Sequence, residues 1–318
     1  MRPRVIMAFA AATILLGGVM LVPTAYARLS GGVESVSLDT VVEVPASTLA
    51  APPPPTLVSA PVKAEGMDDF FSWALLDRAS GEISGAKNMS KTSSTESMIK
   101  IWLVSDYLRQ LGDTEPSAER KRQASSAIRD SDDSAAESLY RLGGRDAVIT
   151  RMIKLCRLTD TRPGAPAGSR GVWWSYTQMS PRDAVRLGEC VKNGTAAGPR
   201  WTNWVLAEMT KVRGSTASKD QQRTRGGGRW GIIDGLPKEL LAQSPVAIKN
   251  GWTLIGADGM WHLNCLAVTD DWALAVMMRY RGARGLDHGA DTCASVATQL
   301  VSARPGAALK IPAPLVKS

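Results

Sequence analysis

Strand-forming sequence occurs only at the two ends of the folded part of this chain, and this separation constrains its architecture more than any other feature. Residues 70–78 have strand composition, and residues 82–86 can return beside them after the Ala79-Ser80-Gly81 turn. Three more strand-type runs lie far downstream, at residues 246–254, 261–269 and 272–280. A single sheet can therefore form only if both ends of the chain contribute strands to it.

The block between these strands has helical periodicity and helix boundary signals. Apolar residues recur at helical spacing from Ser97 to the breaker Gly112. Ser180 and Pro181 suit the N-cap and first position of a helix. Long loops are expected at residues 161–176 and, basic and Gly-rich, at 214–229. The expected helices cover residues 97–111, 117–130, 133–142, 180–192, 200–213 and 287–302.

These elements predict an α+β fold, in which an antiparallel sheet with flanking helices carries an inserted all-helical lobe at about residues 97–230. We expect the folded domain to cover residues 67–305, with a tail at 306–318. A Pro-rich linker is expected at residues 28–66, because the four consecutive prolines at 52–55 favour an extended segment.

The N-terminus has the pattern of an export signal. Arg2 and Arg4 precede an apolar run over residues 5–22, and Ala25-Tyr26-Ala27 is a cleavage site of the A-x-A type. The run is close to the shortest length that crosses a bilayer, so a retained anchor is the alternative to cleavage. In either case we expect a protein that is secreted or anchored on the outer side of the cytoplasmic membrane, and that meets the membrane only through residues 1–27.

Composition limits the classes of function. The net charge of +8 is modest and spread along the chain, so no nucleic-acid partner is expected. The basic residues at 211–229 are interpreted as a solvated loop. The chain has only two histidines, His262 and His288, which disfavours a metal site or a histidine base; we expect both to satisfy local structure, and we expect no metal and no cofactor. We expect a monomer.

The four cysteines, Cys156, Cys190, Cys265 and Cys293, are an even set in a chain bound for an oxidising compartment. This favours two disulfides over a metal site. Three pairings are possible. We favour Cys156–Cys190 with Cys265–Cys293 because each pair joins neighbouring elements, and buried free thiols are the alternative.

The first chemical motif is Ser97-Met98-Ile99-Lys100, at the first turn of the apolar helix. Positions i and i+3 share a helix face, so Lys100 can take a proton from Ser97 if burial and nearby cations lower the lysine pKa. The helix N-terminus also favours a developing oxyanion. Ser84 and Lys87 have the same spacing, but they lie in the hairpin with no helix following, and we treat that match as coincidence.

Two more motifs follow in order. Ser131-Asp132-Asp133 lies between two predicted helices, and Lys249-Asn250-Gly251-Trp252 lies within a predicted strand. The three motifs together resemble the S-x-x-K, S-x-N and K-[ST]-G elements of the serine β-lactamase and penicillin-binding-protein superfamily, with the class A β-lactamase-like branch as the nearest match. The resemblance runs from about Trp73 to Ser302.

The resemblance implies a role for each motif residue. Ser97 would be the acylated nucleophile, Lys100 its base, and Ser131 the relay that carries the proton to the leaving nitrogen. The backbone amides of Ser97 and Trp252 would form the oxyanion hole. Four residues would bind substrate. Asp133 would contact the amide of the substrate, and Lys249 would contact the carboxylate of the substrate. Asn250 would take the place of a hydroxyl residue, and Gly251 would let the substrate backbone lie along the strand edge.

Three departures from the family pattern bear on the reaction. Asp133 replaces an asparagine, so it lacks a donor when ionised and raises the pKa of a neighbouring lysine. Asn250 replaces a threonine or serine. The class A enzymes also carry, in the loop before the Ser180 helix, a glutamate that activates the deacylating water, whereas no acidic residue lies between Asp160 and Asp183 here.

The resemblance therefore implies an exported serine hydrolase that forms an acyl-enzyme with β-lactams or D-Ala-D-Ala-type cell-wall peptides and deacylates slowly. A catalytically silent relative that binds a cell-wall ligand or a partner protein is the alternative. In that case Ser97 is a helix cap, Lys100 a solvated charge, Ser131-Asp132-Asp133 a polar turn and Lys249 an exposed strand residue. Trp173, Trp174 and Tyr176 either pack against the helical lobe or line the mouth of the site.

Overall fold

The computed structural model of the chain describes residues 54–67, 69–221 and 226–302. The expected export segment, the N-terminal part of the expected linker and the expected tail at 306–318 lie outside these ranges. Among the helices of the described ranges, none has both the length and the apolar character needed to cross a membrane.

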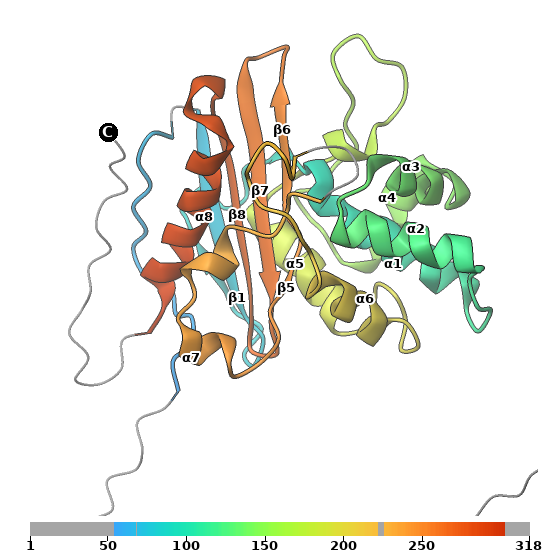
Figure 1. Cartoon of the computed structure of the whole chain (residues 1–318), viewed down its shortest axis with the longest axis horizontal. Coiled ribbons are helices and arrows are strands. Elements are labelled where there is room, and N and C mark those ends of the chain that lie inside the picture. The colour runs from blue at the N-terminus through green and yellow to red at the C-terminus, as the bar shows by residue number, and fades with distance from the viewer. Residues whose placement is uncertain (1–53, 68, 222–225, 303–318) are drawn as a thin grey trace, which may run out of the picture. The chain divides into compact units, whose positions relative to one another are not determined.

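The central sheet is antiparallel and takes strands from both ends of the domain (Figure 1). Its order is β2–β1–β8–β7–β5. Strand β6 also pairs with β7, along a different stretch of β7 from β5. The predicted opening hairpin is confirmed, and the last two predicted strands are present. The six strands are β1 (Phe70–Asp77), β2 (Ile83–Gly85), β5 (Ala247–Ile248), β6 (Gly251–Ile255), β7 (Met260–Val268) and β8 (Trp272–Arg281).

The strand expected at residues 246–254 is divided into β5 and β6. The interruption falls on Lys249 and Asn250, two buried polar residues whose side chains leave the sheet to bond with other segments. The sequence pattern does not reveal this break, because the residues on both sides of Lys249 and Asn250 are strand residues.

The helical lobe lies between β2 and β5 in the sequence, as predicted. It contains one helix that we did not predict, α4, which follows Gly144 and Arg145, both in the left-handed region at φ 89° and 55°. The helix expected to reach residue 213 ends early, because the Arg213 amide bonds to the Arg129 carbonyl instead of continuing the helix. The lobe comprises α1 (Lys100–Leu111), α2 (Ala118–Arg129), α3 (Asp133–Leu142), α4 (Asp146–Leu155), α5 (Pro181–Lys192) and α6 (Thr202–Met209).

Shorter elements complete the domain. A two-stranded sheet pairs β3 (Ser93–Ser94) with β4 (Gln178–Met179), beside the turn that leads into α1. The C-terminal helix α8 (Gly285–Leu300) follows the last strand. The remaining elements are the short helix α7 (Lys238–Leu241) and the 3-10 turns at Glu96–Ile99, Trp174–Tyr176, Ile232–Gly235 and Gly282–Arg284.

Helix α1 forms the centre of the helical lobe. Its apolar residues are buried around most of the circumference, so the helix is enclosed by neighbours and does not lie on the surface. The Trp102 indole donates a 2.8 Å hydrogen bond to the Val148 carbonyl of α4. This packing fixes the N-terminal end of α1, where Lys100 begins the helix and the preceding 3-10 turn carries Ser97.

The sheet separates α8 from the helical lobe (Figure 1). Adjacent residues of β7 show this separation, because Cys265 bonds to α8 while Leu266 faces Gly188 of α5. Residues 54–66, which we expected to belong to the linker, also pack along α8: Leu57 is buried and the Val58 amide bonds to the Leu300 carbonyl. The folded domain therefore includes this part of the expected linker.

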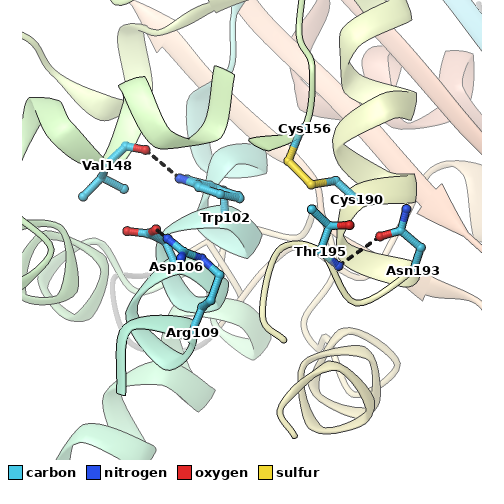
Figure 2. The surroundings of a disulfide bond; sticks show 8 residues. All are labelled: Trp102, Asp106, Arg109, Val148, Cys156, Cys190, Asn193 and Thr195. Carbon is cyan, nitrogen blue, oxygen red and sulfur yellow. Dashed lines mark hydrogen bonds and ion pairs between the residues drawn. A yellow bond between two sulfur atoms is a disulfide. The ribbon is translucent and has the colours of Figure 1, made fainter. Parts of the chain in front are cut away.

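Both disulfides have the favoured pairing. Cys156, at the end of α4, is bonded to Cys190 of α5 with a Cα–Cα distance of 5.4 Å. Figure 2 shows this bridge beside the Trp102–Val148 contact of the helical core. Cys265 of β7 is bonded to Cys293 of α8 with a Cα–Cα distance of 6.4 Å. One bridge thus stabilises the helical lobe, and the other holds α8 on the sheet.

Candidate active site

Ser97 lies in the 3-10 turn that precedes α1, and β6 packs directly against this turn. A Cβ atom added to Gly251 would lie 2.7 Å from the Ser97 amide nitrogen and 2.5 Å from that of Met98. Gly251 is therefore required for the close approach of two backbone segments, whatever its relation to a substrate. The amides of Ser97 and Trp252 come from these two adjoining segments, as an oxyanion hole would need.

Lys100 begins α1, one turn after Ser97, and its side chain is fully buried. Its Nζ atom donates to Asp133 Oδ1 at 2.5 Å, to the Ser131 carbonyl, and weakly to Ser131 Oγ at 3.4 Å. The first two motifs therefore meet through the ammonium group of Lys100.

Ser131 lies between α2 and α3 in the left-handed region, with φ of 56°. The Asp132 carboxylate caps α3 by accepting from the Ala135 amide, so this turn is fixed at the start of a helix. A left-handed conformation is costly for a residue other than glycine, and it directs Ser131 toward both lysines. The polar turn of the alternative interpretation is thus part of a larger polar cluster.

Lys249 completes the cluster from the sheet. Its fully buried Nζ atom donates to Ser131 Oγ at 2.9 Å and to the Asn250 carbonyl at 2.7 Å. The side chain also lies near the Trp252 ring, 5.9 Å from its centroid. The interpretation of Lys249 as an exposed strand residue is therefore wrong.

Asn250 does not have the orientation that we expected. Its amide nitrogen donates to the carbonyls of Gly228 and Trp230 at 3.0 and 2.8 Å, and the residue is 2% exposed. Both N–H groups are thus committed to the loop that precedes the strand. The expected replacement of a substrate-binding hydroxyl by this amide is corrected, because Asn250 anchors a loop in this conformation.

Burial is the largest influence on the pKa of both lysines. Burial lowers the pKa of Lys100, and this effect outweighs the raising effect of Asp133, whose side chain is 80% exposed. Burial and the charge of Lys100 together hold the pKa of Lys249 well below its usual range. The expectation that Asp133 works against a lysine base is right in sign, but burial is the larger effect.

The loop before α5 brings an aromatic residue to Lys100, not an acid. Lys100 Nζ lies 5.2 Å from the centroid of the Trp174 ring, and Trp174 Nε1 donates to Glu137 of α3 at 3.2 Å. Trp174 is therefore both packed and adjacent to the site, whereas its neighbour Trp173 is 53% exposed and stacks edge-on with Tyr176.

The two acids that bracket this loop have structural partners. Asp160 accepts from Ser180 Oγ at 2.8 Å and from the Arg182 guanidinium at 2.7 Å. Asp183 is buried and accepts from the Asp160 amide at 2.7 Å and the Thr161 hydroxyl at 2.8 Å. Both carboxylates hold the ends of the loop together.

The sequence interpretation missed a second polar group behind Ser97. Ser94 Oγ lies 2.6 Å from Nδ1 of His262, and Nε2 of the same ring lies 2.8 Å from the Asp258 carboxylate. Glu96, immediately before Ser97, is 3% exposed and accepts from Thr253 Oγ1 at 2.6 Å. The only signal in the sequence is the four-residue spacing of Asp258 and His262 around a turn, and the other partners come from distant segments.

Comparisons with known proteins bear on the fold that carries this cluster. No protein-family model matches the chain. A protein named "Putative lipoprotein LppW", from Mycobacterium tuberculosis and Mycobacterium bovis, is 28% identical over 205 residues. The match covers 64% of this chain and 60% of the relative, so the chain spans less than two thirds of that protein's length.

Solved β-lactamase structures superpose on most of the domain. The enzyme from Streptosporangium roseum gives a TM-score of 0.55 at 16% identity, covering 74% of this chain and 92% of its own. The enzyme from Xanthomonas campestris gives 0.54 at 18% identity, covering 74% and 91%. The enzyme from Chitinophaga pinensis gives 0.55 at 14% identity, covering 73% and 93%. The chain therefore has the serine β-lactamase fold, as the order of its three motifs predicted.

Proposed function

We propose that the protein is an exported serine hydrolase that forms an acyl-enzyme through Ser97 with β-lactams or D-Ala-D-Ala-type cell-wall peptides, and that it releases the acyl group slowly. The observation that carries this proposal is the position of the Ser131 hydroxyl, which lies 2.9 Å from Lys249 Nζ and 3.4 Å from Lys100 Nζ. Residues from three separated motifs thus meet at Ser131, and Lys100 lies one turn after Ser97 in the chain.

This arrangement supports a proton path that uses no histidine. Ser97 Oγ would attack the carbonyl carbon of the substrate, and its proton would pass to neutral Lys100. The proton would then move through Ser131 to the leaving nitrogen, while the carbonyl oxygen would accept from the amides of Ser97 and Trp252. Lys249 would supply positive charge for the substrate carboxylate when protonated, while burial and the charge of Lys100 lower its pKa.

Slow release follows from the loop before α5. Hydrolysis of an acyl-enzyme needs a base that activates water, and Trp174 occupies the loop position next to Lys100. The nearest acids along the loop, Asp160 and Asp183, are engaged with Arg182 and with backbone amides. The acyl group would therefore persist on Ser97 for many times longer than it takes to form.

A cell-envelope location fits this function. The relative from Mycobacterium tuberculosis carries the word lipoprotein in its name. The export pattern at residues 1–27 also directs this chain across the cytoplasmic membrane. We propose the space outside that membrane as the place where the domain meets its substrate.

A silent ligand-binding protein is the second candidate, and two observations favour it. Asp133 forms an ion pair with Lys100, and the amide of Asn250 is turned into the protein. Both would lower the efficiency of a site that otherwise has the parts for acylation.

Intact-protein mass spectrometry after incubation with a reactive penicillin tests the proposal. We expect an adduct of one penicillin per chain on the unmodified protein and none on Ser97→Ala. Ser84→Ala is the matched control, because Ser84 and Lys87 repeat the motif spacing in the hairpin, and it should be labelled normally. A protein that acquires no adduct at any penicillin concentration would support the silent alternative.

A further inference from the structure

We propose that Glu96 is a positioning residue for acyl transfer at Ser97, which it supports only as a neutral carboxyl group, and that Asp258, His262 and Ser94 exchange its proton with solvent. This inference rests on the proposed acylation of Ser97. It concerns residues outside the three motifs.

The surroundings of Glu96 favour its neutral form. The residue is 3% exposed, and its Oε2 atom accepts one 2.6 Å hydrogen bond from Thr253. Among the described residues, none forms a hydrogen bond of normal geometry with Oε1, which is also buried. A carboxylate that is removed from water with so few donors is costly. The backbone is in the left-handed region, with φ of 48°, so the fold holds the side chain here against its own preference.

A line of side chains connects this carboxyl group to the surface. Asp258 is 42% exposed, and its carboxylate lies 2.8 Å from Nε2 of His262, whose side chain is 9% exposed. Nδ1 of His262 lies 2.6 Å from Oγ of Ser94, which is 1% exposed. Thr253, the donor to Glu96, is the direct cross-strand neighbour of His262. The line therefore runs from solvent to Ser94, and Thr253, beside His262 in the sheet, bonds to Glu96.

The bonding pattern of this line fixes how a proton can move. With Asp258 ionised, Nε2–H of neutral His262 donates to it, and Nδ1 accepts from the Ser94 hydroxyl. If Glu96 loses its proton to Ser94 Oγ, the Ser94 proton passes to Nδ1 and His262 becomes a cation. One proton is thus shared by Glu96 and His262, and the cation can then release it to water at the Asp258 end.

The charges around Glu96 place its titration in the working range. Burial raises the pKa of Glu96 to about 7, with the hydroxyls of Ser94 and Thr253 and the charge of Lys100 opposing the shift and Asp133 adding to it. Burial lowers the pKa of His262, with Asp258 opposing and Arg279 reinforcing the shift. Tyr176 also faces Glu96, and burial and this carboxyl group raise its pKa, so it stays neutral.

Ionisation of Glu96 would act on the reaction through the backbone. The Ser97 amide that would stabilise the oxyanion belongs to the peptide unit joining Glu96 to Ser97. A negative charge on the Glu96 side chain opposes the negative charge that develops on the substrate oxygen. Acylation should therefore slow as the pH rises through the pKa of Glu96, by up to about tenfold per pH unit above it. Deprotonation of Lys100 has the opposite sign, so the two effects must be separated.

The pH dependence of labelling by a fluorescent penicillin, compared with that of Glu96→Gln, separates them. Glutamine keeps an oxygen for Thr253 and stays neutral. We expect the ratio of the labelling rates, unmodified over Glu96→Gln, to fall steeply above about pH 7. Thr253→Val removes the donor that stabilises ionised Glu96, so the fall should move to higher pH. A ratio that is independent of pH would overturn the proposal, even if Glu96→Gln is slower throughout, because a structural role alone predicts that result.

A second measurement keeps the inference apart from the proposed function. The ring nitrogens of His262 can be titrated by NMR in the full chain, with His288 as the only other histidine. We expect a step near the pKa of Glu96 that is lost in Glu96→Gln and in Ser94→Ala. If penicillin never labels the protein, the proposed function fails. The step in the His262 titration then still tests whether Glu96 and His262 share a proton. A His262 titration identical in all three proteins would overturn it.

Discussion

The two sides of Lys100 differ in which of the groups needed for the proposed hydrolysis they carry. On one side, buried Lys249 and half-buried Ser131 are hydrogen-bonded to each other and placed by a broken strand and a left-handed turn. On the other side, the loop before α5 presents Trp174 where it approaches the lysine. Under the proposed function, the first side would supply groups that form an acyl-enzyme, whereas the described loop before α5 brings no acid to Lys100 that could activate water for its hydrolysis. We infer that the two half-reactions place independent demands on the same fold.

Lys100→Ala should change the rate of acylation more than replacing either disulfide or Asp133 would. Loss of the base should slow acylation by about 10²–10⁴-fold. The buried Lys100 side chain also fills space, so Lys100→Met separates lost chemistry from lost packing. The rate is measured by fluorescent-penicillin labelling, with Lys87→Ala, in the exposed second match of the motif, as the control. Labelling of Lys100→Met at the unmodified rate would show that another group takes the proton.

The disulfides should show whether the loop before α5 contributes to acylation as well as to stability. Cys156–Cys190 spans the loop that carries Trp174, and Cys265–Cys293 holds α8 on the sheet, with sequence separations of 34 and 28. Replacing either pair by alanine should lower the free energy of unfolding by about 3 kcal/mol, measured by urea denaturation. Removing the first pair should leave the labelling rate of the folded protein unchanged, because Ser97, Ser131 and Lys249 lie outside that loop. A large loss of labelling would link the loop to acylation.

Asp133→Asn should have the smallest effect, and it should be a gain. The substitution removes the charge that raises the pKa of Lys100 and restores an amide donor. Because the Asp133 side chain is 80% exposed, solvent weakens its influence, and we expect labelling to speed up by only about two- to fivefold. Slower labelling of Asp133→Asn in a stopped-flow assay would mean that the ion pair positions Lys100 for the reaction.

Much of the fold and half of the site could be predicted because their signals are local or ordered along the chain. The hairpin, the Ser180 N-cap and the three motifs each depend on a few adjacent residues. The side-chain orientation of Asn250 could not be predicted, because it depends on the carbonyls of Gly228 and Trp230, more than one loop away.

The group behind Ser97 could not be predicted for the same reason. Ser94, Glu96 and His262 meet only after β6 and β7 pack against the turn before α1. Packing against the helical lobe and contact with Lys100 were alternatives for Trp174 in the sequence, and the structure combines them, because the indole donates to Glu137 while its ring faces Lys100. Long-range contacts of single polar residues leave no periodic trace in a sequence.

Burst kinetics with a chromogenic cephalosporin test the central claim most directly, because a single trace reports both half-reactions. The account predicts a burst of one equivalent of product per chain, followed by a steady phase at least about a hundredfold slower than the burst. The burst should vanish in Ser97→Ala and persist in Ser84→Ala. Rapid linear turnover without a burst would contradict the account, since it would show that a group near Lys100 activates water efficiently.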